Sequence, residues 1–124
     1  METGLPKKIE KPWGYELLLA HTPKYVGKLL FVKKGHRLSL QYHKKKDESI
    51  YVHEGEILLD MGGQDGKLTQ AVVKPGTSFH FPPQTRHRIK ALEDTTLFEA
   101  STPELEHVVR LADDYGRESK GKPD

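Results

Sequence analysis

The chain has 124 residues, which suits a single domain, and 35% of them are hydrophobic, enough for one modest core. Twenty basic residues nearly balance 18 acidic ones, which argues against nucleic-acid binding because such proteins usually carry a basic excess. The absence of cysteine excludes disulfides, thiolate metal sites and a cysteine nucleophile. No apolar run approaches about 18 residues and no apolar leader begins the chain, so we expect a soluble cytoplasmic protein without membrane contact.

Turn residues recur at short intervals and separate runs rich in Val, Ile, Leu, Phe, Tyr and Thr. These runs predict strands over 14–20, 26–33, 36–43, 48–54, 55–61, 67–73, 77–82, 86–92, 95–101 and 106–111. No segment keeps a helical apolar period over three turns, so we expect an antiparallel sandwich or barrel. Residues 1–10 are predicted to form a polar N-terminal arm and 113–124 a polar C-terminal tail, each poorly ordered or lying on the surface, which leaves 11–112 as the barrel domain.

The segment from Gly35 to Gly55 contains the first candidate site. Strand alternation over 36–43 places Arg37, Ser39, Gln41 and His43 on one polar face. A short turn would then set Glu48 beside His43. If this face meets solvent it is an ordinary polar surface, and if it lines a barrel mouth its groups converge. Lys44 to Lys46 are predicted to form a solvated turn, with a phosphate-attracting basic lip as the alternative.

The segment from Pro75 to Ala91 supplies a further donor, because Pro82-Pro83 ends one strand and His87 opens the next. Two imidazoles and a carboxylate are ligands that zinc, iron, manganese and nickel all accept. The pattern therefore favours a metal site over isolated polar residues.

The spacing of these residues resembles the two motifs of the cupin superfamily. The first is Gly35, five residues, Gln41-x-His43, four residues, Glu48, six residues and Gly55. The second is Gly76, five residues, Pro82-x-Gln84, two residues and His87. The sequence departs from the usual motifs at two places, because Gln41 stands where His is usual and Gln84 where Gly is usual.

The string RLSLQYH resembles the cupin domain of type II mannose-6-phosphate isomerases, as do KPWGYE, EASTPEL and VVRLADDYGR. The resemblance covers residues 11 to 117 and implies an all-β, double-stranded β-helix jelly roll. It also implies one divalent ion, most often zinc, with manganese, nickel or iron as alternatives, and a phosphorylated sugar as substrate. The implied metal ligands are Gln41, His43, Glu48 and His87.

An aldose–ketose isomerase of this kind uses its ion to polarise the substrate carbonyl while a base moves the carbon-bound proton. Glu99, Lys28 and Arg37 are the candidate catalytic residues, with proton transfer assigned to Glu99 or Lys28. The candidate substrate contacts are Arg37, Ser39, Arg86 and Arg88, and phosphate binding is assigned to Arg37 or Arg86.

Two other functions fit the same residues. His43, Glu48 and His87 form a two-His-one-carboxylate set, which is typical of non-haem iron oxygenases. A non-catalytic carbohydrate-binding module that has kept its metal is the second alternative. We also expect a homodimer, because pairing would cover an open sheet edge.

Overall fold

The computed structural model describes residues 3–63, 65–104 and 108–119 and is built from β-strands. Their bounds are β1 Lys7–Lys11, β2 Gly14–His21, β3 Val26–Val32, β4 Leu40–His43, β5 Glu48–Glu54, β6 Ile57–Gly62, β7 Leu68–Val73, β8 Ser78–Phe81, β9 Arg86–Ala91, β10 Thr95–Ser101 and β11 Val108–Ala112. In the described ranges no helix has the length and apolar character needed to cross a membrane.

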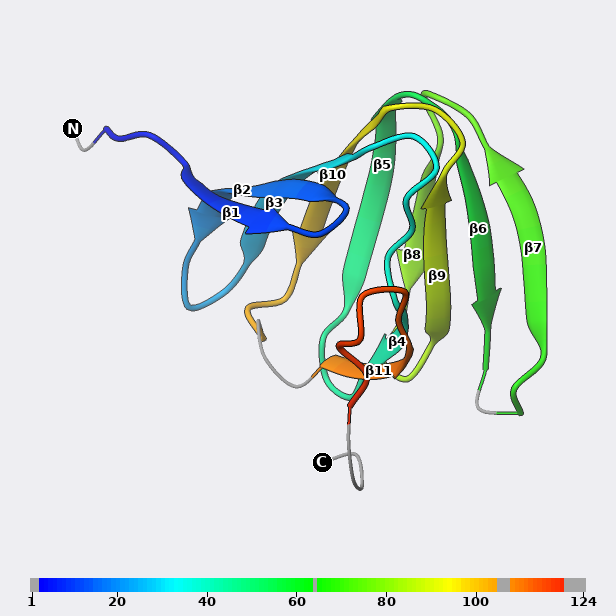
Figure 1. Cartoon of the computed structure of the whole chain (residues 1–124). Coiled ribbons are helices and arrows are strands. Elements are labelled where there is room, and N and C mark those ends of the chain that lie inside the picture. The colour runs from blue at the N-terminus through cyan, green and yellow to red at the C-terminus, as the bar shows by residue number, and fades with distance from the viewer. Residues whose placement is uncertain (1–2, 64, 105–107, 120–124) are drawn as a thin grey trace.

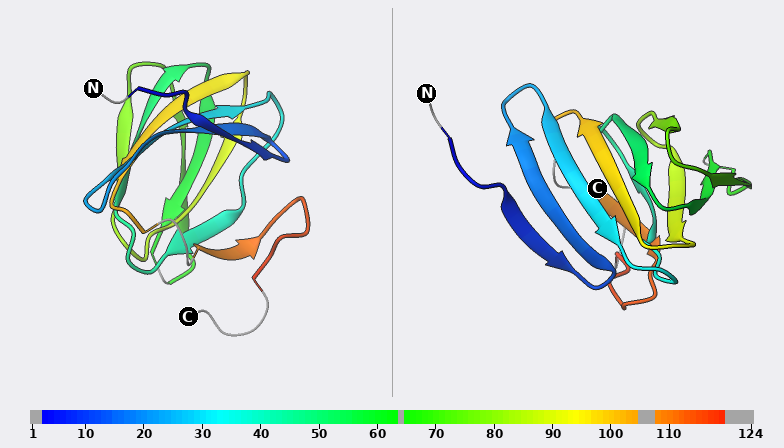
Figure 2. Two further views of the ribbon diagram at one scale, coloured as in Figure 1. Left: turned by 90° about the vertical axis from the view of Figure 1, so that its left-hand side faces the viewer. Right: turned by 90° about the horizontal axis from the view of Figure 1, so that it is seen from above.

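The strands form two antiparallel sheets that face each other. The six-stranded sheet has the order β1-β2-β3-β10-β5-β8, and the five-stranded sheet has the order β11-β4-β9-β6-β7. Figure 1 shows β6, β7 and β9 on one side of the molecule and β1, β2 and β3 on the other. Seen from above, β1, β2, β3 and β10 lie side by side, and β1 and β2 extend their sheet outward (Figure 2). This is the all-β jelly-roll sandwich predicted from the turn pattern.

The core lies between the sheets because the strands alternate apolar inward residues with exposed ones. In β5 the buried residues are Glu48, Ile50 and Val52, while Ser49 and Tyr51 are exposed. Trp13 adds a buried indole from the turn between β1 and β2. The apolar part of the core consists of Trp13, Leu30, Val32, Ile50, Val52, Ile57, Leu59, Val73, Phe81, Ile89, Ala91 and Leu97.

The predicted strands agree with the observed ones except near the chain ends and before Gln41. Lys7–Lys11 pairs with β2 as strand β1, so residues 7–10 of the predicted arm belong to the sheet. Residues 36–39 do not continue β4 and make only an isolated bridge, Arg37 with Lys90. The predicted strand 106–111 appears as Val108–Ala112, and its first two residues lie outside the described ranges.

The beginning of the predicted tail turns back onto the barrel. Arg117 donates to the Asp113 carboxylate at 2.9 Å from both Nε and Nη2, and the Arg110 backbone amide donates to Ser119 Oγ at 3.0 Å. These bonds hold residues 113–119 beside β11, which is the surface-lying alternative of the prediction, and residues 120–124 of the tail lie outside the described ranges.

Candidate metal centre

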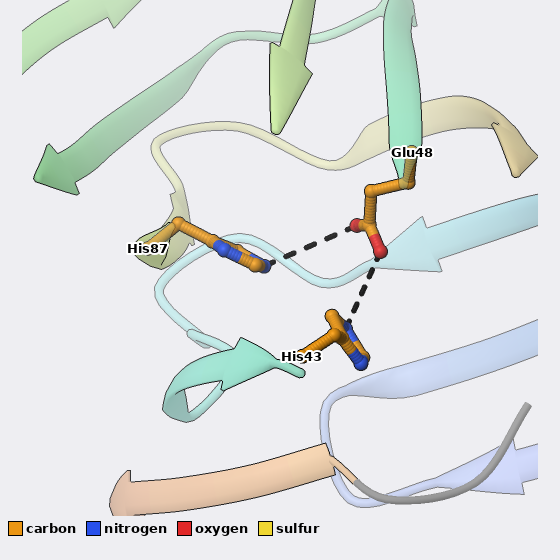
Figure 3. A group of neighbouring side chains, drawn as sticks. All are labelled: His43, Glu48 and His87. Atoms are coloured by element: carbon orange, nitrogen blue, oxygen red, sulfur yellow. Dashed lines mark ion pairs between the residues drawn. The ribbon is translucent and has the colours of Figure 1, made fainter. Parts of the chain in front are cut away.

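Three side chains meet where the two sheets approach each other at the end of β4. His43 is the last residue of β4, Glu48 the first of β5, and His87 the second of β9. Their potential ligand atoms all lie within 4.8 Å of one another. Glu48 bridges the histidines, with Oε2 at 3.3 Å from His43 Nε2 and Oε1 at 3.9 Å from His87 Nε2 (Figure 3).

The surroundings of His87 fix its tautomer. Its Nδ1 lies 3.1 Å from the carbonyl oxygen of Thr85, and a carbonyl can only accept, so Nδ1 carries the proton. Nε2 then presents its lone pair to Glu48 and His43. The ring also stacks on Phe81, with centroids 3.9 Å apart and planes inclined by 13°. This support is what a metal-ligating histidine needs to hold its orientation.

The turn before His87 is tied to the end of β4. The Gln84 amide N–H donates to the His43 carbonyl oxygen at 2.7 Å, and Gln84 Nε2 donates to the Lys44 carbonyl oxygen at 3.1 Å. Gln84 has φ of 72°, in the left-handed region that favours glycine. The structure thus explains why the cupin motif usually has glycine here, and why Gln84 is held by side-chain bonding instead.

Both histidines are held neutral. Burial, together with the nearby charge of Lys46, lowers the pKa of His43 to about 3. Burial likewise lowers the pKa of His87 to about 4. Neutral imidazole is the form that binds a metal, so neither ring needs to lose a proton to do so near neutral pH. The buried Nδ1 of His43 has no hydrogen-bond partner among the residues that the structure describes.

Lys46 is the main correction to the sequence interpretation. It was predicted to lie in a solvated turn, but it is 6% exposed and inserts its ammonium between two carboxylates. Nζ lies 2.9 Å from Glu99 Oε2 and 3.1 Å from Glu48 Oε2. Burial alone would lower the pKa of Lys46, but Glu99 and Glu48 raise it above its usual value. The side chain therefore carries a full charge beside the histidines.

The pKa of Glu48 is also raised in these surroundings. Burial and the charge of Glu99 raise it, the charge of Lys46 opposes them, and the net result is a pKa of about 7. A bound cation would favour the ionised carboxylate. The site thus has two neutral imidazoles and a carboxylate that gains from a positive charge.

Gln41 lies at this site, opposite His87 in the β4–β9 pairing. Its Oε1 accepts a 2.6 Å hydrogen bond from Ser39 Oγ, and its Nε2 lies 3.4 Å from His43 Nε2. To serve as the predicted ligand, the amide would have to turn so that Oε1 faces the histidines and Nε2 faces Ser39. Coordination by Gln41 therefore stays a prediction.

The donor set fits a divalent ion. The two imidazole nitrogens and the carboxylate oxygen lie within 4.8 Å of one another, whereas bonds of about 2.1 Å to one ion place its ligand atoms at most about 4.2 Å apart, so small side-chain movements would bring all three to bonding distance. His43, Glu48 and His87 would hold it. The same set is compatible with zinc, manganese, iron or nickel, so the donors favour a metal but do not select one.

A partly enclosed cavity of about 110 Å³ opens over this centre. Glu99 and Lys28, the two candidates for proton transfer, both line it and are direct cross-strand partners in the β3–β10 pairing. Glu99 is 7% exposed, and its Oε2 accepts from Ser101 Oγ at 3.2 Å. Lys28 Nζ forms an ion pair with Glu16 Oε1 at 3.2 Å.

The other predicted substrate contacts lie outside the cavity lining. Arg37 pairs with Asp114 through two hydrogen bonds of 2.6 and 2.8 Å, because residues 36–39 leave the regular strand alternation. Arg88 donates to the Leu38 carbonyl and also lies near Asp114. Arg86 stands over the Tyr42 ring at 5.4 Å. Ser39 is fully buried under Gln41.

The sequence interpretation missed several residues that do line the cavity. Lys46 lies in the turn between β4 and β5, where strand alternation does not apply, so the strand period gives no signal for its inward direction. The others come from the ends of the chain, and no local pattern connects them with the histidines: Lys11, Glu16, Arg110 and Arg117.

Comparisons with solved structures agree with this fold. KdgF from Halomonas sp. is similar at 23% identity and a TM-score of 0.67, over 79% of this chain and 88% of that one. An RmlC-like cupin from Shewanella frigidimarina is similar at 22% identity and a TM-score of 0.69, over 82% and 86%. A variant of oxalate decarboxylase from Bacillus subtilis gives 17% identity and a TM-score of 0.74 over 90% of this chain, which spans a third of that protein.

These identities show a shared fold and leave the activity open. No curated protein matches the sequence. The model of the cupin domain family matches residues 28–99, which is more than half of the chain and includes all three residues of the metal centre. The chain therefore belongs to the cupin domain family.

Proposed function

We propose that this cupin is a metal-dependent isomerase acting on a phosphorylated sugar, of the mannose-6-phosphate isomerase type. The observation that carries the proposal is a buried carboxylate, Glu99, on the cavity wall beside the metal centre and joined to Glu48 through Lys46. An aldose–ketose interconversion needs a Lewis acid at the oxygens and a base at the carbons, and these two parts adjoin here.

The bound ion would polarise the substrate carbonyl and favour negative charge on its oxygen. Glu99 would take the proton from the carbon next to the carbonyl and return it to the neighbouring carbon, while a hydroxyl proton passes to the former carbonyl oxygen. Ser101 donates to Glu99 and Lys46 contacts it, so the carboxylate has a fixed direction. Lys28 is less suited to act as the base, because its ammonium forms an ion pair with Glu16.

Lys46 would position the two carboxylates rather than react. Its ammonium lies within 3.1 Å of both and offsets their mutual repulsion.

The test is incubation of the protein, loaded in turn with zinc, manganese, nickel and iron(II), with mannose 6-phosphate and with fructose 6-phosphate. Interconversion that is lost in Glu99→Gln and retained in Glu54→Gln, a control at an exposed glutamate that ends β5, would support the proposal. No interconversion of these or other hexose and pentose phosphates with any of the metals would refute it.

One observation favours a second candidate. Among the described residues the group consists of His43, Glu48 and His87, which is the two-His-one-carboxylate set of non-haem iron oxygenases. Oxygen uptake with iron(II) but not with zinc, in the presence of a sugar phosphate, would support that activity in place of isomerisation.

A further inference from the structure

The cavity carries more positive than negative side chains. Among the described residues that line it, five are cationic and three are carboxylates. The cations are Lys11, Lys28, Lys46, Arg110 and Arg117, and the carboxylates are Glu16, Glu48 and Glu99. A metal ion would add further positive charge. The cavity as a whole therefore favours a negatively charged ligand.

Three of these cations already have carboxylate partners. Lys46 contacts Glu48 and Glu99, Lys28 contacts Glu16 at 3.2 Å, and Arg117 makes a two-bond pair with Asp113. The charges of these three side chains are therefore already balanced by carboxylates of the protein.

Lys11 and Arg110 differ from the other three. Neither forms an ion pair with any carboxylate of the described residues, although both are half-buried and both line the cavity. The charge of Glu16 raises the pKa of both side chains, but Glu16 forms its ion pair with Lys28. Half-buried cations without counter-ions are unfavourable in the empty protein, and a bound anion would relieve that cost.

Strand pairing places Arg110 next to the metal centre. Arg110 lies opposite Gln41 in the β11–β4 pairing, and Gln41 lies opposite His87 in the β4–β9 pairing. Cross-strand partners point to the same face, so the guanidinium projects from the side that carries the histidines. The β11–β4 and β4–β9 spacings are about 5 Å each, so the backbones of Arg110 and His87 are about 10 Å apart, and both side chains line the same cavity.

The charges of these residues also act on each other. Burial lowers the pKa of Lys11, and the charges of Lys28, Arg110 and Arg117 lower it too, against the opposing effect of Glu16. Burial and the charge of Arg117 lower the pKa of Arg110, against the smaller opposing effects of Asp113 and Glu16. Such repulsion between cations would fall when an anion lies among them.

We propose that Lys11 and Arg110 form the subsite that binds the phosphate group of the substrate. The identity of this substrate as a sugar phosphate rests on the proposed function. The Arg110 guanidinium offers the fork of N–H donors that matches two phosphate oxygens, and the Lys11 ammonium adds a point charge. Arg37, Arg86 and Arg88 lie outside the cavity lining, so this subsite replaces the one expected from sequence.

The experiment measures binding rather than turnover, by calorimetric titration of the zinc-loaded full chain with mannose 6-phosphate, mannose, glucuronate and inorganic phosphate. The variants are Arg110→Gln, Lys11→Gln and the matched control Lys74→Gln, which removes one exposed lysine from the turn between β7 and β8. Thermal unfolding of each variant shows whether it is folded.

We expect mannose 6-phosphate to bind at least tenfold more tightly than mannose. Arg110→Gln and Lys11→Gln should each weaken binding of the phosphate ester about tenfold or more, as expected for a lost charge-assisted hydrogen bond, with binding of mannose unchanged. Lys74→Gln should bind all four ligands as the unchanged protein does.

Equal affinity of the folded Arg110→Gln and Lys11→Gln variants for mannose 6-phosphate would overturn the subsite, even if isomerisation occurs. Tighter binding of glucuronate than of mannose 6-phosphate, sensitive to the same substitutions, would overturn the assignment to phosphate in favour of a carboxylate. Binding that depends on Arg110 and Lys11 without any turnover would support the subsite and refute only the isomerase.

Discussion

Replacing Lys46 by Met tests the charge arrangement on which the site depends. The substitution keeps a similar chain length but leaves the carboxylates of Glu48 and Glu99 buried without their shared cation, which lies 2.9 and 3.1 Å away in the unchanged protein. With an effective dielectric constant of about 20, each of these contacts has a Coulomb energy of about 5 kcal/mol, most of which offsets desolvation. Removing one member of a buried ion pair costs about 3–5 kcal/mol.

The free energy of unfolding of the metal-free Lys46→Met protein at pH 8 should therefore fall by about 3 kcal/mol, equivalent to a decrease in Tm of about 10 °C for a chain of this size. The loss should be smaller at pH 5, because the pKa of Glu48 is about 7 and this carboxyl is then already protonated. Metal should recover part of the stability, since it supplies a cation to Glu48.

Urea unfolding at both pH values, with and without zinc, measures these differences. The control is Lys45→Met, which removes an exposed lysine from the same run and should change stability by less than about 0.5 kcal/mol. A loss below about 1 kcal/mol at pH 8, or an equal loss at pH 5 and pH 8, would refute the inferred role of Lys46.

Three further predictions follow from the site and the sheet edges. Zinc affinity should rise about tenfold per pH unit between about pH 5 and 7 and level off above, because one proton must leave Glu48 while both histidines are already neutral. Competition with a chelator measures this affinity, and a pH-independent affinity would count against Glu48 as a ligand. His87→Ala should lower zinc affinity at least a hundredfold and His80→Ala, at an exposed histidine, should not; equal affinities by the same titration would exclude His87. A homodimer should give the mass of two chains by light scattering at micromolar concentration, because β1 and β8 leave open edges on one sheet; a mass of one chain would contradict it.

The strands and the metal centre could be predicted because both depend on short-range patterns. Alternation and turn residues locate most strand bounds, and β5 and β10 agree with prediction at both ends. The motif spacing places His43 at the end of one strand and His87 at the start of another, and sheet pairing brings them together around Glu48. These patterns repeat within a few residues, so the sequence displays them directly.

The parts that sequence could not supply depend on long-range contacts. Strand alternation predicted that Arg37 faces the site. The chain departs from strand geometry at 36–39, and the Arg37 guanidinium donates hydrogen bonds to Asp114 instead. A run of three lysines does not reveal that Lys46 alone is buried, because its carboxylate partner Glu99 comes from a strand more than 50 residues later. Lys11 and Arg110 reach the cavity from opposite ends of the chain, which only the sheet order determines.

The central claim is that one divalent ion is held by His43, Glu48 and His87 at the base of the cavity. Anomalous diffraction from crystals of the purified protein, with elemental analysis of the same sample, tests it most directly. The account predicts about one equivalent of metal and a single anomalous peak at about 2.0–2.2 Å from the Nε2 atoms of both histidines and from a Glu48 oxygen. A peak elsewhere, or no retained metal after loading with zinc, manganese, nickel and iron, would contradict it.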